Sequence, residues 1–138
     1  MLRVVVDTNV LFTGLTRRGS EADIIDAWAG RRFLPCVSTA LALEYQATLG
    51  SKLGPRKKHL ALPALQALLS RCEFVAIWYL YRPSSPDPGD DLVVECVLNS
   101  RSLLVTQNVR DFRAPARQLG FTVLKPAEFL DLLNRSKP

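Results

Sequence analysis

The chain has 138 residues, of which 48% are hydrophobic and 22% charged, a balance typical of one globular domain and unlike that of a disordered chain. Its longest apolar run, FVAIWYLY at residues 74–81, is too short to span a bilayer, and the N-terminus lacks a signal-peptide pattern, so we expect a single cytoplasmic domain over residues 1–138. The formal net charge of +5 permits a polyanionic partner but does not prove one.

Hydrophobic periodicity in the first part of the chain predicts two strands and two helices. Residues 2–6, apolar apart from Arg3, are typical of a strand that is buried on both faces in a parallel sheet. A capping box and a helical stripe predict a helix over residues 20–30. A second strand, weakened by a proline, follows at residues 33–37. Serine and threonine caps then begin a helix over residues 38–49.

The rest of the chain continues the alternation of strand and helix. The segment GSKLGPRKKH at residues 50–59 is predicted as a loop, and leucines at helical spacing predict a helix over residues 62–71. A strand is expected at residues 74–79, and Asp87 with Pro88 is typical of the start of a helix that reaches about residue 99. The remaining elements are strands at residues 103–106 and 121–124 and a helix from residue 126. This order indicates an α/β fold with a mainly parallel sheet covered on both faces.

Several carboxylates follow the predicted strands, at the edge where a parallel sheet places its functional crevice. They are Asp7, Glu44, Asp90 and Asp111. Carboxylates brought together repel one another unless they are protonated, paired or coordinated to a cation. Oxygen ligands suit Mg²⁺ or Mn²⁺, and one or two such ions lower the pKa of a water and stabilise charge on a phosphodiester. We therefore expect a metal site at this edge of the sheet.

Residues beside these acids have supporting roles in this hypothesis. Thr8 and Asn9 are expected to form a turn and to hold the direction of the first carboxylate by hydrogen bonds. Asp90 is preferred as a ligand over Asp91, which is expected to be a neighbour or an exposed residue. Glu95, one helical turn beyond Asp91, either supports the site from behind or faces solvent.

Each acid also has a purely structural interpretation. The alternatives are a turn cap for Asp7, a surface helix position for Glu44, an N-cap for Asp87, compensation of the helix dipole for Asp90, and a loop cap for Asp111. The charge pattern has two interpretations as well. Residues 31–71 contain seven basic residues and one acid, which suits an enzyme that acts on a polyanion but also a basic protein with a solvated surface.

The cysteines and the single histidine argue against other chemistry. Cys36, Cys72 and Cys96 are odd in number, lack a CxxC spacing and lie in or beside apolar segments, so we expect reduced, buried thiols. His59 lies in the basic run PRKKH, which is a poor setting for a Ser-His-Asp or Cys-His mechanism. A zinc site, a disulfide framework and histidine-based catalysis are therefore disfavoured.

Five segments together resemble a PIN domain, and most closely the bacterial VapC-type toxins of toxin–antitoxin pairs. In chain order they are VVVDTNVL, STALALEYQATL, DPGDDLVVECVLNS, SLLVTQNVRDF and FTVLKPAEFLDLL. This resemblance implies a Rossmann-like three-layer α/β/α sandwich. It also implies a Mg²⁺- or Mn²⁺-dependent endoribonuclease that cleaves single-stranded RNA, with a small antitoxin protein as partner and commonly a homodimer.

The resemblance also assigns residues. Asp7, Glu44 and Asp90 match the first three acids, Asn9 matches the polar residue two places after the first acid, and TQNVRDF supplies Thr106, Asn108 and Asp111. The sequence departs from the family at Asn108, where many members carry Asp. An amide offers an oxygen without a charge, so either Asp111 completes the acidic set or a second metal site is weakened.

Three functional hypotheses follow. The first is a metal-dependent endoribonuclease in which basic residues, chosen by their location, contact the phosphates of the RNA: Lys57, Lys58 and Arg110. The second, motivated by Asn108, is a catalytically inactive PIN-fold module that binds RNA or a protein. The third is an aspartyl phosphatase, which is disfavoured because Asn9 stands where that chemistry needs a proton donor.

Apolar residues at Leu62–Leu69 and Trp28 are candidate material for a dimer interface.

Overall fold

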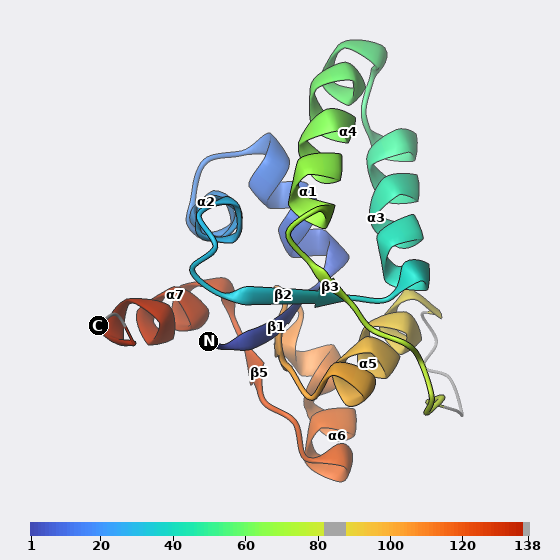
Figure 1. Ribbon diagram of the computed structural model, residues 1–138, viewed down its shortest axis with the longest axis vertical. Coiled ribbons are helices and arrows are strands. Elements are labelled where there is room, and N and C mark those ends of the chain that lie inside the picture. Colours follow the sequence, from blue (N-terminus) through green and yellow to red (C-terminus); the bar gives the residue numbers. More distant parts are fainter. Residues whose placement is uncertain (82–87, 137–138) are drawn as a thin grey trace.

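The computed structural model describes residues 1–81 and 88–136, so the predicted helix cap Asp87 lies outside the described residues (Figure 1). The elements in chain order are β1 (Arg3–Val6), α1 (Thr8–Thr16), α2 (Ser20–Ala29), β2 (Leu34–Val37), α3 (Thr39–Lys52), α4 (Pro55–Leu69), β3 (Glu73–Phe74), α5 (Pro88–Ser100), β4 (Leu103–Val105), α6 (Val109–Leu119), β5 (Val123–Leu124) and α7 (Pro126–Arg135).

Five strands within the described residues form one sheet in the order β3-β2-β1-β4-β5. Each neighbouring pair is parallel, and β1 is central, with Val4 opposite Pro35 on one side and Leu103 on the other. Because the chain adds strands outward from β1 in both directions, the strand order reverses between β1 and β4. In parallel sheets, this reversal opens a crevice at the carboxyl ends of the two strands.

The helices cover both faces of the sheet. Figure 1 shows α1 to α4 on one side of the strands and α5 and α6 on the other, with α7 beside α2. The predicted Rossmann-like three-layer α/β/α sandwich is therefore confirmed. No helix within residues 1–81 and 88–136 is long and apolar enough to cross a membrane.

An aromatic cluster forms the core under α2 and α3. The ring of Trp28 makes edge contacts with Phe33 and Tyr45 at centroid distances of 6.4 and 6.5 Å, and Phe33 meets Phe129 of α7 at 5.2 Å. The indole N–H of Trp28 donates to the carbonyl of Leu68 at 2.9 Å. Trp28, Leu65 and Leu68 are buried, so the suggestion that these residues supply a dimer interface is wrong for them: they pack the core of the monomer.

Two segments predicted as turn or loop are largely helical. Thr8 and Asn9 do not form a turn but open α1, because Asp7 caps this helix and its carbonyl accepts from the N–H groups of Val10 and Leu11. The turn or loop expected at residues 50–59 is confined to residues 53–54, since α3 continues to Lys52 and α4 begins at Pro55. Proline at the first helical position has the backbone angle that a helix requires.

The expected strand at residues 74–79 is also mostly wrong, because β3 ends at Phe74. The following backbone is held instead by the side chain of Asn99, whose Oδ1 accepts from the N–H groups of Trp78 and Tyr79 at 2.7 and 3.0 Å. Trp78, Tyr79 and Leu80 are 82%, 71% and 68% exposed. Their apolar character therefore does not mark a buried strand.

Candidate active site

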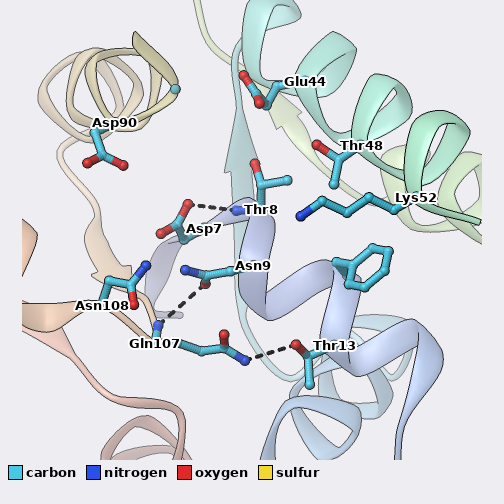
Figure 2. A pocket seen from close by; sticks show the side chains of 12 residues that line it. Asp7, Thr8, Asn9, Thr13, Glu44, Thr48, Lys52, Asp90, Gln107 and Asn108 are labelled. Carbon is cyan, nitrogen blue, oxygen red and sulfur yellow. Dashed lines mark hydrogen bonds between the residues drawn. The ribbon is translucent and has the colours of Figure 1, made fainter. Parts of the chain in front are cut away.

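A cavity of about 360 Å³ lies beyond the carboxyl ends of β1 and β4, where the strand order reverses (Figure 2). Its walls come from the start of α1, one face of α3, the start of α5 and the residues that follow β4. The lining residues are Asp7, Thr8, Asn9, Phe12, Thr13, Glu44, Thr48, Lys52, Gly89, Asp90, Gln107 and Asn108.

Asp7 is held by both central strands. It is 6% exposed, and its backbone N–H donates to the carbonyl of Val105 on β4 at 2.9 Å. Its carboxylate accepts from the backbone N–H of Thr8 at 2.8 Å and from the hydroxyl of Thr106 at 2.6 Å. These bonds fix the direction of the carboxylate. Asp7 is thus both the N-cap of α1 and a lining residue of the cavity, so the cap that was the structural alternative is present.

Thr106 connects Asp7 to the residues after β4. Its side chain is fully buried, and the hydroxyl that donates to Asp7 also accepts from the N–H of Asn108 at 3.0 Å. The amide oxygen of Asn9 accepts from the N–H of Gln107 at 3.4 Å, a long hydrogen bond. Thr106 therefore supports the site without lining it, whereas Asn9 and Asn108 line the cavity directly.

Glu44 reaches the cavity because α3 is anchored to β1. Ser38 caps this helix by accepting from the N–H of Leu41 at 3.1 Å, and the buried Tyr45 donates its hydroxyl to the carbonyl of Val6. Burial raises the pKa of Tyr45 well above its ordinary value, so the phenol keeps the proton that makes this bond. The adjacent face of α3 then lines the cavity with residues spaced four apart: Glu44, Thr48 and Lys52.

Several lining residues were missed by sequence reasoning. Lys52 places its Nζ 5.3 Å from the centroid of the Phe12 ring. Gln107 donates its amide N–H groups to the Thr13 hydroxyl at 3.0 Å and to the Glu21 carboxylate at 2.8 Å, which ties the end of β4 to α1 and α2. The four-residue spacing from Glu44 is the signal that identifies Lys52.

Residues on α5 take three different positions. Asp90 lies in the first turn and lines the cavity. Asp91 was expected to be a neighbour of the site or an exposed residue. It is 4% exposed and is not among the lining residues, so the exposed alternative is wrong. Glu95 is also buried, away from the cavity wall, and its carboxylate accepts from the backbone N–H of Tyr81 at 3.1 Å. Glu95 therefore positions the segment that leaves β3.

The fourth predicted acid lies elsewhere. A helix that sequence reasoning missed, α6, begins at Val109, and Asp111 is exposed in its first turn without lining the cavity. The basic residues proposed from sequence are also outside the lining set: Arg110 is exposed on α6, while Lys57 and Lys58 lie on the first turn of α4. The structure thus brings together Asp7, Glu44 and Asp90, and it separates Asp111 from them.

The donor set of the cavity fits a hard, oxygen-coordinated cation. Asp7, Glu44 and Asp90 offer carboxylates and Asn108 offers an amide oxygen, which are the ligands that Mg²⁺ and Mn²⁺ take. Within residues 1–81 and 88–136, however, no three His, Cys, Asp or Glu side chains stand close enough to hold a metal ion as they are. The three carboxylates face one cavity, and sharing an ion requires their side chains to rotate toward each other.

The thiols and the histidine take no part in this cavity. Cys36, Cys72 and Cys96 are unpaired by disulfides, and burial raises the pKa of Cys72 and of Cys96 to about 12, which keeps both thiols protonated and unreactive. His59 is exposed on α4, away from the lining residues.

Comparisons with known proteins agree with this fold. A sequence model of the PIN domain family matches residues 3–110. VapBC2 from Rickettsia felis bound to a promoter DNA fragment contains a chain that is 14% identical, with a TM-score of 0.62 over 90% of this chain and 98% of that one. The comparison with curated proteins finds no match.

Two further structures share the fold at a similar level. FitAB bound to the IR36 DNA fragment aligns with a TM-score of 0.60 at 15% identity, over 89% of this chain and 94% of that one. FitAcB from Neisseria gonorrhoeae aligns with a TM-score of 0.59 at 14% identity, over 90% and 98%.

Proposed function

Because this chain belongs to the PIN domain family, we propose that it is a metal-dependent endoribonuclease that cleaves phosphodiester bonds of single-stranded RNA. One observation carries the proposal: Asp7, Glu44 and Asp90 come from three segments far apart in sequence and line a single cavity at the switch point of the sheet. Bringing like charges to one place is unfavourable unless they are protonated, paired or coordinated to a shared cation.

The residues of the cavity have distinct roles in this proposal. Asp7, Glu44 and Asp90 would hold Mg²⁺ or Mn²⁺, with the amide oxygen of Asn108 as a weaker donor. When bound, such an ion supplies Lewis acidity to a water and to the phosphate oxygens. The hydrogen bonds from Thr8 and Thr106 keep the Asp7 carboxylate aimed at the cavity, which reduces the reorganisation needed during reaction. Asp111, which does not line the cavity, has no role in metal binding in this proposal.

A single-stranded RNA substrate suits the charge of the chain. The net charge of +5 attracts a polyanion despite the acidic cavity. Lys57, Lys58 and Arg110 remain proposed phosphate contacts at a distance from the cavity. Because unpaired bases bind mainly through shape and stacking, these residues would supply affinity and not a sequence preference.

The biological setting is also part of the proposal. The structures that share the fold include VapBC2 and FitAB complexes with DNA, which supports the role of a toxin that is held by a small antitoxin protein. A homodimer and a cytoplasmic location are proposed on the same basis. Co-purification of the chain with the product of an adjacent small gene tests the antitoxin, and sedimentation of the purified protein tests the dimer.

One observation favours a second function. Asn108 lines the cavity without the charge that many family members have there, and a site with fewer charges binds divalent cations more weakly. A catalytically inactive module that binds RNA or a protein through the same fold is therefore the alternative.

The replacement Asp7→Asn tests the enzyme against the alternative. Asparagine caps helices as well as aspartate does, so we expect the variant to fold, to lose binding of Mn²⁺ in calorimetric titration and to lose metal-dependent RNA cleavage. Asp131→Asn removes an exposed carboxylate on α7 and is the matched control. Undiminished cleavage by Asp7→Asn would refute the assignment, while the lack of Mn²⁺ binding by the unaltered protein at millimolar metal would favour the inactive module.

A further inference from the structure

A lysine lies in a cavity whose other charged lining residues are all acids. Lys52 is in the last turn of α3 and lines the cavity together with Asp7, Glu44 and Asp90. Side chains on a helix lean toward its N-terminus, which directs Lys52 over Thr48 and toward the space that Glu44 faces. In the view of Figure 2, its ammonium group enters the cavity from α3, while Asp7 and Asp90 lie across from it.

The ammonium group of Lys52 is not neutralised by these acids. Within residues 1–81 and 88–136 the single ion pair joins Arg3 and Glu73, so no carboxylate of the described chain lies within salt-bridge distance of Lys52. The Nζ instead stands 5.3 Å from the centroid of the Phe12 ring, a cation–π contact that holds the amine without satisfying its three N–H donors. A positive charge held on a ring at the wall of a cavity is available to an anion.

A cation near the end of a helix also has a structural explanation. Basic residues in the last turn stabilise the helix dipole, and that effect requires only that the charge lie near the last carbonyls. It does not account for a side chain that lines a cavity with three carboxylates, beside the ring of Phe12 from α1. The position of Lys52 is explained if the ligand of the cavity binds the metal and also carries a negative charge of its own.

We propose that Lys52 binds a phosphodiester group of the substrate from the α3 wall, opposite Asp7 and Asp90. This inference rests on the proposed function, because it assigns a protein contact to the same phosphate that the proposed metal ion would contact. The ammonium would form a charge-assisted hydrogen bond to a phosphate oxygen. It would thereby position the RNA backbone and stabilise negative charge that develops on the phosphate.

Binding and cleavage of RNA by Lys52→Gln, Lys52→Arg and the unaltered protein test the proposal separately. Fluorescence anisotropy with a labelled single-stranded oligonucleotide in Ca²⁺ buffer gives affinity as a function of salt. We expect Lys52→Gln to flatten the plot of log affinity against log salt by about 0.7, the contribution of one phosphate contact on a single strand. In Mn²⁺ buffer we expect a fall in kcat/KM of about 10- to 100-fold, the effect of losing one charge-assisted hydrogen bond. Lys52→Arg should restore most of both.

The control is Arg117→Gln, which removes one positive charge from the exposed last turn of α6 outside the cavity. It should leave the salt dependence and kcat/KM unchanged. Because each replacement removes one basic residue from the last turn of a helix, Lys52→Gln and Arg117→Gln should lower the unfolding temperature to a similar, small extent. The proposal is overturned if Lys52→Gln matches the unaltered protein in salt dependence and kcat/KM. If the unaltered protein binds RNA with the expected Lys52-dependent slope but does not cleave it, the nuclease function fails and the phosphate contact stands. If the unaltered protein cleaves RNA and Lys52→Gln cleaves it equally well, the nuclease function stands and the phosphate contact fails.

Discussion

At the scale of single residues, Asp7 shows how one side chain meets two requirements. A carboxylate at the end of a buried strand is costly unless it is hydrogen-bonded. The N–H of Thr8 and the hydroxyl of Thr106 satisfy that need, and the positive end of the α1 dipole adds to it. These hydrogen bonds also hold the carboxylate in the orientation in which the proposed cation would meet it.

The replacements Asn108→Asp and Asp111→Asn test which position completes the acidic set. Asn108 lines the cavity, whereas Asp111 is exposed on α6 and does not. We therefore expect Asn108→Asp to strengthen Mn²⁺ binding by about tenfold, since ligand charge is a main determinant of affinity for hard cations. We expect Asp111→Asn to leave it unchanged. Calorimetric titration measures both, and a loss of affinity in Asp111→Asn would return that residue to the site.

At the scale of elements, the close approach of α1 and α2 controls one wall of the cavity. A Cβ on Gly14 of α1 would stand 2.5 Å from the Cγ1 of Ile25 and 2.6 Å from the carbonyl oxygen of Glu21 on α2. Only glycine allows the two helices to pack this closely. The same contact lets Gln107 reach Thr13 and Glu21 at once, so helix packing and the position of the β4 end are coupled.

The pair Gly14→Ala and Gly50→Ala tests this packing. Gly14→Ala should destabilise the fold by about 1–3 kcal/mol, the usual cost of overpacking. Gly50 lies in α3, and a Cβ added there would meet nothing within 4 Å, so Gly50→Ala should stabilise by about 0.5–1 kcal/mol through helix propensity. Urea unfolding gives both values. Equal effects of the two replacements would contradict the close approach.

The elements also show why sequence predicts some of the structure and not the rest. Residues 4–6 are a buried apolar run of the kind found in parallel strands, so β1 and the acid after it were predictable. In α6, the apolar residues Val109, Phe112, Ala116 and Leu119 recur at helical spacing, but Phe112 is the one buried residue and Pro115 lies inside the helix. The helix was therefore missed, and a loop cap stood as the structural alternative for Asp111. The exposed aromatic residues after β3 caused the opposite error. A strand was predicted there, but the backbone is held by the side chain of Asn99.

At the scale of the whole molecule, the site exists only when the sheet is assembled. Asp7 follows β1, Glu44 lies on α3 after β2, and Asp90 lies on α5 before β4. The parallel order of β2, β1 and β4 brings these segments to one edge. Sequence could predict that acids after parallel strands gather there. Lys52 was missed although its spacing from Glu44 is a signal in the sequence, because the face of α3 that meets the cavity is decided by the burial of Tyr45 against the end of β1.

Metal binding should therefore stabilise the whole fold. An ion held by carboxylates that are far apart in the unfolded chain binds the native state alone, and it adds about 2.7 kcal/mol at a concentration of about 100 times its dissociation constant. We expect Mn²⁺ to raise the unfolding temperature by several degrees, with the increase growing with metal concentration. Asp7→Asn should abolish the increase while Asp131→Asn keeps it. An unfolding temperature that is independent of Mn²⁺ in the unaltered protein would contradict a shared ion, because linkage leaves no way to bind the folded state without stabilising it.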